Sequence, residues 1–174
     1  CISDQFFDDN NANTTIELQR GYYDDFSFDE DWDVTGNASR GMWERGVPNG
    51  NSFDTLDINP FFDVDDDCGN QVYITENSEI ALDGGVEGGF TALTSPVFDG
   101  TLYEDPYVSY YRWFFSGSLN GTPNDSLVVR LHNGDTSVVI DFVTSEDLDQ
   151  MFDWYLVNKR VSDYITPTSN MNIS

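Results

Sequence analysis

The stretch FFDVDDDCG, residues 61–69, places four aspartates next to one of the chain's two cysteines. Calcium takes six to eight oxygen ligands from carboxylates, amides and backbone carbonyls, usually in loops, and such a run could supply several of them. An EF-hand fails on its register: counting from Asp63 puts Cys68 where glycine is required and Ile74 where a bidentate glutamate is required. Two interpretations stay open, a loop-built calcium site and an acidic run that water solvates.

Four carboxylates from three segments are the predicted calcium ligands. Asp25, with Asp24 as its alternative, belongs to an acidic and aromatic block; Asp65 and Asp67 lie in the acidic run, and Asp83 lies in the sequence LDGG. A calcium ion bound there would stabilise the fold by mass action, because it binds the folded chain.

Cys1 and Cys68 are the only cysteines. An even count in a chain expected outside the cell favours one disulfide between them, which the chain-entropy model values at roughly 4 kcal/mol for a long loop. A lipidated Cys1 and two free thiols are the alternatives.

The composition describes an acidic chain with a packed core. Its 174 residues include 32 acids and 7 bases, a net charge of −25, yet 39% are hydrophobic and 15% aromatic. That charge repels phosphate backbones and anionic headgroups, which argues against nucleic acid and membrane-surface partners. No apolar run approaches the ~20 residues of a membrane span. The excess of acidic residues favours a secreted or cell-surface protein, because cations outside the cell screen the self-repulsion of the chain.

Catalytic motifs are scarce. With His132 as the only histidine, the Ser-His-Asp, Cys-His and histidine-rich zinc constellations are implausible, and His132 is expected to flank a turn. No phosphate-binding loop or nucleophile elbow is present. Paired carboxylates for glycoside hydrolysis cannot be singled out among so many acids, so the chain is predicted not to be an enzyme, with a hydrolase as the third hypothesis.

Alternating apolar residues predict mostly strands. The clearest case is residues 126–143, where two alternating runs flank Asn133-Gly134, a hairpin signal that requires positive φ at both turn positions. Residues 107–115 are bulky on both faces, which predicts a central strand. Residues 145–152 alone look helical, with Ser145 as the cap. Further strands are expected at residues 41–46, 71–75, 90–98 and 154–161.

Many short strands with Gly, Asn and Pro turns predict an all-β protein, an antiparallel β-sandwich of jelly-roll type with at most one or two short helices. Residues 1–20 are expected to be a lead-in segment and residues 21–174 a single sandwich domain that lacks its final strand or strands. Residues 171–173 would begin the next strand. Either another chain fills the gap by strand addition, with Ile2, Phe6 and Phe7 as donor side chains, or the sequence is part of a longer one.

Four blocks in this order resemble a known module: YDDFSFDEDWDVTGNASRGMWERGVPNG, CGNQVYITENSE, DGGVEGGFTALTSPVFDGTLYEDPYVSYYRWFFS and DSLVVRLHNGD. The set, from Tyr23 to about Ile173, is similar to the MAM and cleaved-adhesin jelly rolls of secreted, multidomain Bacteroidetes-type surface proteins. The resemblance implies a non-catalytic, calcium-stabilised β-sandwich for adhesion or substrate binding. Asp25 falls at the family's opening acid, and Asp83 precedes the diglycine. Family members usually continue further, to a strand with an Asp-Asp pair that this sequence does not include.

The leading functional hypothesis is therefore an extracellular binding or adhesion module, with glycans as a candidate ligand. Exposed aromatic rings stack on sugar faces, and Trp43, Tyr103 and Tyr107 are the predicted ligand-binding residues; the alternative is that such rings belong to the core. The second hypothesis is a structural subunit of an extracellular filament or sheath, assembled through sheet edges. Glycosylation sequons begin at Asn13, Asn37, Asn120, Asn124 and Asn172.

Overall fold

The computed structural model describes residues 21–65, 67–80, 85–117 and 124–174. These residues form an all-β structure in which every ladder is antiparallel, as the sequence predicts. The strands in chain order are β1 (Asp33–Gly36), β2 (Trp43–Gly46), β3 (Asn51–Phe53), β4 (Leu56–Asn59), β5 (Val72–Thr75), β6 (Thr91–Thr94), β7 (Tyr107–Arg112), β8 (Ser126–His132), β9 (Ser137–Thr144), β10 (Tyr155–Arg160) and β11 (Asn172–Ile173).

Helical structure in the described residues is limited to three single 3-10 turns, η2 (Gly100–Leu102), η3 (Leu148–Gln150) and η4 (Val161–Asp163). The helix predicted over residues 145–152 is only the turn η3. Its cap residue is Asp147, not Ser145, and the Asp147 carboxylate instead accepts hydrogen bonds from the backbone N–H (2.9 Å) and hydroxyl (3.1 Å) of Thr144. A side chain that bonds back to the end of β9 favours a turn over a helix. No helix in the described part of the chain is long and apolar enough to cross a membrane.

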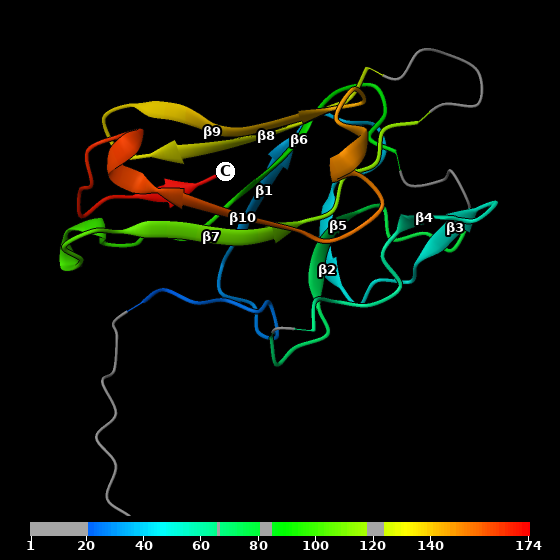
Figure 1. The fold of residues 1–174 in the computed structure, drawn as a ribbon, viewed down its shortest axis with the longest axis horizontal. Helices are drawn as coiled ribbons and strands as arrows, with labels where there is room; N and C mark the ends of the chain where they lie inside the picture. The colour runs from blue at the N-terminus through cyan, green and yellow to red at the C-terminus, as the bar shows by residue number, and fades with distance from the viewer. Residues whose placement is uncertain (1–20, 66, 81–84, 118–123) are drawn as a thin grey trace, which may run out of the picture.

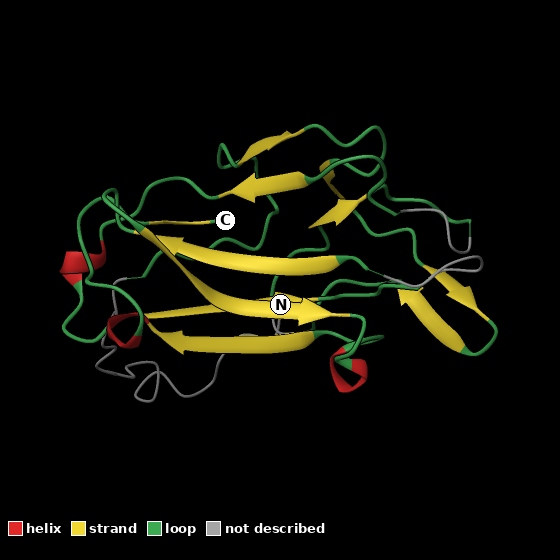
Figure 2. Ribbon diagram, turned by 90° about the horizontal axis from the view of Figure 1, so that it is seen from above, coloured by secondary structure: helices red, strands yellow, loops and turns green. Residues whose placement is uncertain are grey.

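The long strands form two facing layers, the three-stranded sheet β11-β8-β9 and the ladder β7-β10 (Figures 1 and 2). Between them lies the larger core cluster, whose buried members come from β8, β9, η4 and the C-terminal segment and whose half-buried members include two residues of β7. This arrangement is a β-sandwich; its jelly-roll connectivity stays a prediction. The buried members are Leu131, Ile140, Val161, Ile165 and Met171, and the β7 residues are Val108 and Tyr110.

The strand β7 pairs with β10 alone within the described residues, so the prediction that it is central was wrong. Its bulky residues on both faces suggested burial on both sides. In the structure the face that carries Val108 and Tyr110 packs on the core, while Tyr107 on the other face is exposed. A bulky aromatic side chain therefore lies on an outer face here.

The β8-β9 hairpin is confirmed, but its turn differs from the predicted one. His132 faces Ser137, so four residues form the loop, and only Gly134 has a positive φ (+87°). The Asn133 side chain organises the loop because its Oδ1 accepts the N–H groups of Asp135 (3.2 Å) and Thr136 (3.0 Å). An asparagine that bonds its own backbone two residues on removes the need for a second left-handed residue.

A β-bulge interrupts the same hairpin. Val129 faces Asp141 and Arg130 faces Val139, which leaves Ile140 as the extra residue of β9. In a regular strand, consecutive side chains point to opposite faces, whereas a bulge can turn both to one side. Ile140 is buried in the core and the Asp141 carboxylate also points between the layers. The bulge thus directs the charged Asp141 side chain into the interior of the sandwich.

That charge neutralises a buried arginine. Arg112 of β7 donates from Nε to Asp141 at 2.6 Å, and these side chains are 4% and 13% exposed. The guanidinium also bonds Gln150 and lies over the Tyr155 ring, with Cζ 4.7 Å from the ring centroid. Its third nitrogen, Nη1, is buried and has no hydrogen-bond partner within the described ranges. The cluster connects β7, β9, β10 and η3.

The predicted strand start at residues 171–173 is confirmed as β11, which is bonded on both sides. It pairs with β8, and on the other side the Ser95 N–H donates to the Ile173 carbonyl (2.9 Å) while Phe98 and Met171 exchange backbone bonds of 2.8 and 3.0 Å. Met171 is fully buried. The prediction that further strands follow this segment stays a prediction.

The residues before 98 form short ladders, β1-β6, β2-β5 and the β3-β4 hairpin (Figure 1). The expected strands at 41–46 and 71–75 are confirmed, and that at 90–98 is shortened to β6. The β3-β4 hairpin, which has no clear alternation in its sequence, lies at one end of the molecule and was not predicted. These ladders bring the acidic segments together.

Candidate functional site

Two of the predicted calcium ligands lie in segments that pack against each other. A Cβ atom on Gly69 would lie 2.9 Å from the carbonyl oxygen of Asp25 and 2.7 Å from the hydroxyl of Ser27, so only glycine allows this approach. Each aspartate forms a tight turn on its own side: Asp25 Oδ1 accepts the Ser27 N–H (3.0 Å), and Asp67 Oδ1 accepts the Gly69 N–H (3.1 Å). The bond from Ser27 lowers the pKa of Asp25.

A third aspartate, Asp63, joins them. Its Oδ1 accepts the N–H of Val64 at 2.7 Å, whereas its Oδ2 is buried and has no hydrogen-bond partner among the described residues. Burial raises the pKa of Asp63, and the negative charges of Asp67 and Asp25 raise it further. The same charges act on Tyr23. Burial, followed by the negative charges of Asp67 and Asp25, raises the pKa of the Tyr23 hydroxyl. We refer to Asp25, Asp63 and Asp67 as the acidic cluster.

Sequence reasoning did not choose Asp63 as a ligand. The available signal was the alternation of Asp63, Asp65 and Asp67, since every second residue of an extended segment points to one side. Of these, Asp65 is exposed, while Asp63 and Asp67 are half-buried. Asp65 therefore does not share the electrostatic environment of the other two.

The acidic cluster is a set of interacting charges rather than an assembled cage. No three histidine, cysteine, aspartate or glutamate side chains in the described ranges are arranged to hold a metal ion. The fourth predicted ligand, Asp83, lies outside the described residues, as does Cys1. Cys68 is an exposed free thiol next to the cluster, so the disulfide with Cys1 stays a prediction.

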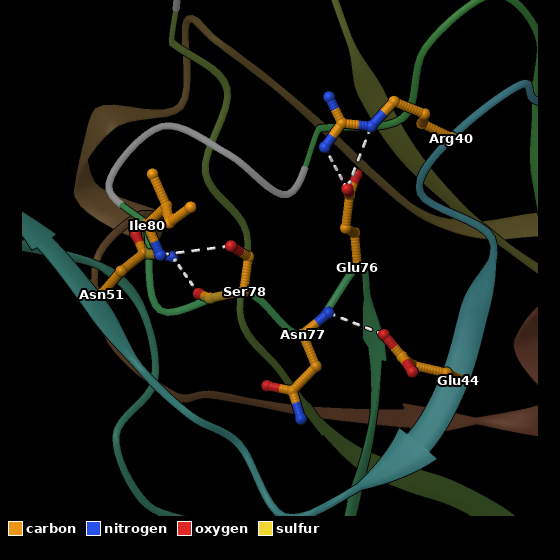
Figure 3. Close-up of polar contacts among 7 residues, drawn as sticks. All are labelled: Arg40, Glu44, Asn51, Glu76, Asn77, Ser78 and Ile80. Atoms are coloured by element: carbon orange, nitrogen blue, oxygen red, sulfur yellow. Dashed lines mark hydrogen bonds and ion pairs between the residues drawn. The ribbon is translucent and has the colours of Figure 1, made fainter.

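Other acids near the β2-β5 ladder already have partners (Figure 3). Glu76 pairs with Arg40, and the Glu44 carboxylate accepts the Asn77 N–H at 2.7 Å. Asn77 is the centre of a polar network, because its side chain also donates to the Val47 carbonyl at 2.7 Å. These carboxylates fix a turn and do not form an open site.

The three predicted ligand-binding aromatics lie in different surroundings. Trp43 is half-buried at the start of β2, and its backbone N–H donates to Thr91 at 3.1 Å, which fits the alternative that it belongs to the packed interior. Tyr103, just after η2, is half-buried as well. Tyr107, the first residue of β7, is 56% exposed. Only Tyr107 presents most of its ring to solvent.

Tyr107 belongs to the outer face of the β7-β10 ladder, which sequence reasoning did not identify as a unit. Because strand residues alternate, Tyr107, Ser109 and Tyr111 point away from the core, opposite to Val108 and Tyr110. On β10, Leu156, Asn158 and Arg160 share this face, paired in register with Tyr111, Ser109 and Tyr107 respectively. The signal in the sequence was the alternation within YVSYY.

The middle and one end of this face are held by polar contacts. The Ser109 hydroxyl donates to the Asn158 side-chain oxygen at 3.1 Å, across the two strands. Arg160 donates to Asp105 at 2.6 Å and to Asp163 at 3.3 Å. This face, which we call the tyrosine face, thus presents the exposed Tyr107 and Leu156 and the half-buried Tyr111 around a fixed polar pair.

His132 has the expected turn-flanking role. Its Nε2 lies 2.8 Å from the Ser174 hydroxyl, and burial, followed by the charge of Arg130, lowers its pKa. No carboxylate contact is described for it, so the structure gives it no acid-base partner among the described residues.

Comparison with known proteins adds no name to this arrangement. No protein-family model, no curated protein and no solved structure matches the chain. The resemblance to MAM and cleaved-adhesin modules therefore stays an expectation, and the function has to be inferred from the acidic cluster and the tyrosine face.

Proposed function

We propose that this chain is a non-catalytic binding module of a secreted or cell-surface protein and that calcium stabilises its fold. The observation that carries the proposal is the buried Asp63 Oδ2, which has no hydrogen-bond partner in the described part of the chain and lies in the field of two further carboxylates. A buried charged oxygen without a partner is costly. A divalent cation supplies the missing partner and cancels the repulsion.

The residues present suit calcium better than other metals. They offer carboxylate and carbonyl oxygens in loops, which calcium prefers, and no histidine lies in this part of the chain. Because the described carboxylates are not arranged as a metal site, Asp25 and Asp67 would have to turn toward an ion held by Asp63, and the carbonyl oxygen of Asp25 next to Gly69 would be a further ligand. The ion would fix the opening block on the 63–69 loop.

The proposed location outside the cell is based on the net charge of the chain. With a net charge of −25, the chain is stabilised by surroundings that contain millimolar calcium and salt, which screen its self-repulsion. A binding role rests on the tyrosine face, an outer sheet surface on which Tyr107 is exposed.

Thermal unfolding in calcium and in chelator tests the proposal. We expect millimolar calcium to raise the melting temperature by about 5–10 °C, as for a ligand present at about a hundred times its dissociation constant. Asp63→Asn should abolish this rise, whereas the variant Asp57→Asn, which changes an exposed aspartate of β4 outside the cluster, should retain it. Equal melting temperatures in calcium and chelator would show that the acidic run is merely solvated.

A second candidate function, a filament or sheath subunit, is favoured by one observation. β9 is eight residues long, pairs only with β8 among the described strands, and exposes Val139 and Phe142. An unpaired strand of this length is a template for strand addition. Light scattering of the purified chain checks this: concentration-dependent growth that Val139→Lys abolishes would support assembly, and a monomer at every concentration would reject it.

A further inference from the structure

The β8-β9 hairpin carries an open depression where β8 begins and β9 ends. Its volume is about 350 Å³, and its lining includes the Phe142 ring and two acids, Asp125 and Glu146. Phe142 is 57% exposed, whereas the next residue, Val143, is buried in the second core cluster. Because strand residues alternate, the Phe142 side chain points away from the core. The depression therefore combines an exposed aromatic ring with two carboxylates on the outer side of the sandwich.

These two carboxylates receive no cation from the described chain. Asp125 and Glu146 are exposed, no base lines the depression, and neither acid forms an ion pair among the described residues. The base of β8 that shares this side, Arg130, comes four residues after Ser126, roughly 13 Å along the strand. The charge that would neutralise the depression has to come from a ligand.

The strand beside the depression is the edge of its sheet. β9 pairs only with β8 among the described strands (Figure 1). The bulge at Ile140 interrupts this strand, and residues 141–144 beyond it lead into the depression. An edge strand presents unpaired backbone N–H and C=O groups to which an extended peptide can add as a further strand. Such a peptide would also meet the exposed side chains of Val139 and Phe142.

Charge and shape select the occupant. A second copy of this chain brings 32 acids and only 7 bases to the contact, whereas a basic peptide brings the opposite charge. Lysine and arginine carry their charge on a long apolar stem, and a cation over an aromatic face is attracted by the ring. A bare metal ion would use the carboxylates but neither the ring nor the free edge. A basic side chain on an extended peptide uses all three.

We propose that the β9 edge and this depression bind a basic peptide, which adds as a strand along residues 141–144 and places one lysine or arginine side chain over Phe142, between Asp125 and Glu146. The inference goes beyond the calcium-stabilised binding module, because the contact uses neither the acidic cluster nor the tyrosine face.

Isothermal titration of the whole chain, in chelator and at physiological salt, tests it. The probe is a capped octapeptide that alternates lysine with threonine. One comparison peptide has glutamate in place of each lysine, and another carries N-methyl groups on alternate backbone nitrogens. We expect the lysine peptide to bind and the glutamate peptide not to bind. The N-methylated peptide keeps the charge but loses backbone donors, so it should bind at least about tenfold more weakly.

Variants of the chain locate the contact. Phe142→Ala should weaken binding of the lysine peptide about tenfold, and Glu146→Gln about three- to fivefold, because they remove the ring and one carboxylate. Two matched controls make the same chemical changes elsewhere. Phe53→Ala changes a phenylalanine of β3 that is 49% exposed, and Glu104→Gln changes an exposed acid just before β7. Both controls should bind like the original chain.

Three results would each overturn the inference. The lysine peptide may fail to bind at millimolar concentration, or the N-methylated peptide may bind equally well, which excludes strand addition. Equal binding by all four variants would show a general attraction of cations to an acidic chain. A chain that associates with itself through β9 and does not bind the peptide also rejects the inference, and it leaves the filament subunit as the function of this edge.

Discussion

Residues 98–173 and residues 21–94 form strands by the same backbone pairing but stabilise them differently. Both hydrophobic clusters formed by the described residues are drawn entirely from the later part, where the strands are up to eight residues long. In the described segments of the earlier part no strand exceeds four residues. Of the five described non-glycine residues with positive φ, four lie there, namely Phe26, Asp31, Asp54 and Glu76.

The earlier part depends on turns and polar contacts in place of a large core. Its network around Asn77 joins β2, β5 and the loop before β3, and glycines permit close approaches of the backbone at Gly41 and Gly69. Polar networks of this kind specify geometry but contribute modest free energy per bond. The comparison predicts that the later part dominates global stability and that the earlier part opens locally.

The largest effect is expected from the buried ion pair. Asp141→Ala leaves the Arg112 guanidinium without a counter-charge in the core and should lower the free energy of unfolding by about 3–5 kcal/mol, measured by urea denaturation. Asp105→Ala removes one of the two partners of the exposed Arg160 and should change the free energy of unfolding far less, because solvent screens an exposed ion pair. Similar losses in both variants would contradict the assignment of Arg112 to the interior.

Next in size is the apolar core. Met171→Ala removes a fully buried side chain between β8 and the 95–98 segment and should cost about 2–5 kcal/mol. Leu56→Ala, at the exposed start of β4, should cost under about 1 kcal/mol. Chemical denaturation monitored by tryptophan fluorescence compares the two, and a larger loss at Leu56 would reverse the ranking of the two parts.

A backbone substitution should affect the earlier part alone. Gly41 has φ +75°, and a Cβ atom there would lie 2.5 Å from the Gly85 carbonyl oxygen, so Gly41→Ala should cost about 1–3 kcal/mol. Gly46→Ala, whose Cβ would have its nearest neighbour at 3.5 Å, is the control. Hydrogen exchange should show faster opening of β2 and β5 in Gly41→Ala with β8 and β9 unchanged. Equal acceleration in all four strands would mean that the two parts unfold as one unit.

The smallest effect concerns the acidic cluster and has a defined pH dependence. The pKa of Asp63 is raised by folding, so its ionised form opposes folding at pH values above its folded pKa, and this cost disappears as the pH falls below the unfolded value of about 4. In chelator, Asp63→Asn should therefore raise the melting temperature at pH 7 by about 1–2 °C, or roughly 0.5 kcal/mol after screening. At pH 3 the variant and the original chain should melt together. A gain that persists at pH 3 would have another cause than charge.

The sequence predicted the fold of residues 98–173 better than that of residues 21–94. In the later part, apolar alternation and Asn133-Gly134 predict the β8-β9 hairpin. A long strand with one buried face has apolar residues at about every second position, and this pattern can be recognised in the sequence. The bulge at Ile140 and the inward direction of the Asp141 side chain were not predicted, because the alternation of residue types does not show where the register of a strand pair shifts. In the earlier part, β3 and β4 bury only Asn51 and Ile58 and carry almost no periodic signal.

The candidate site was foreseen only in part for a similar reason. Asp25 and Asp67 were selected by their residue type, and the structure brings their segments together through Gly69. Asp63 and Asp65 are indistinguishable by type, and only the fold tells that one is half-buried and the other exposed. Tyr107 was selected as a single ring, whereas its partners Ser109 and Asn158 meet only once β7 and β10 pair across 49 residues of sequence.

The position of β11 has a consequence for the order of folding. It separates β8 from the 95–98 segment, so these two parts of the chain cannot complete their hydrogen bonding until residues 171–173 have been synthesised. A nascent chain that ends before β11 exposes two unpaired edges and the apolar space that Met171 fills. Contacts over such a sequence separation also slow the search for the native state. On the ribosome, the docking of β11 should therefore be required before β8 and the 95–98 segment are joined in one layer.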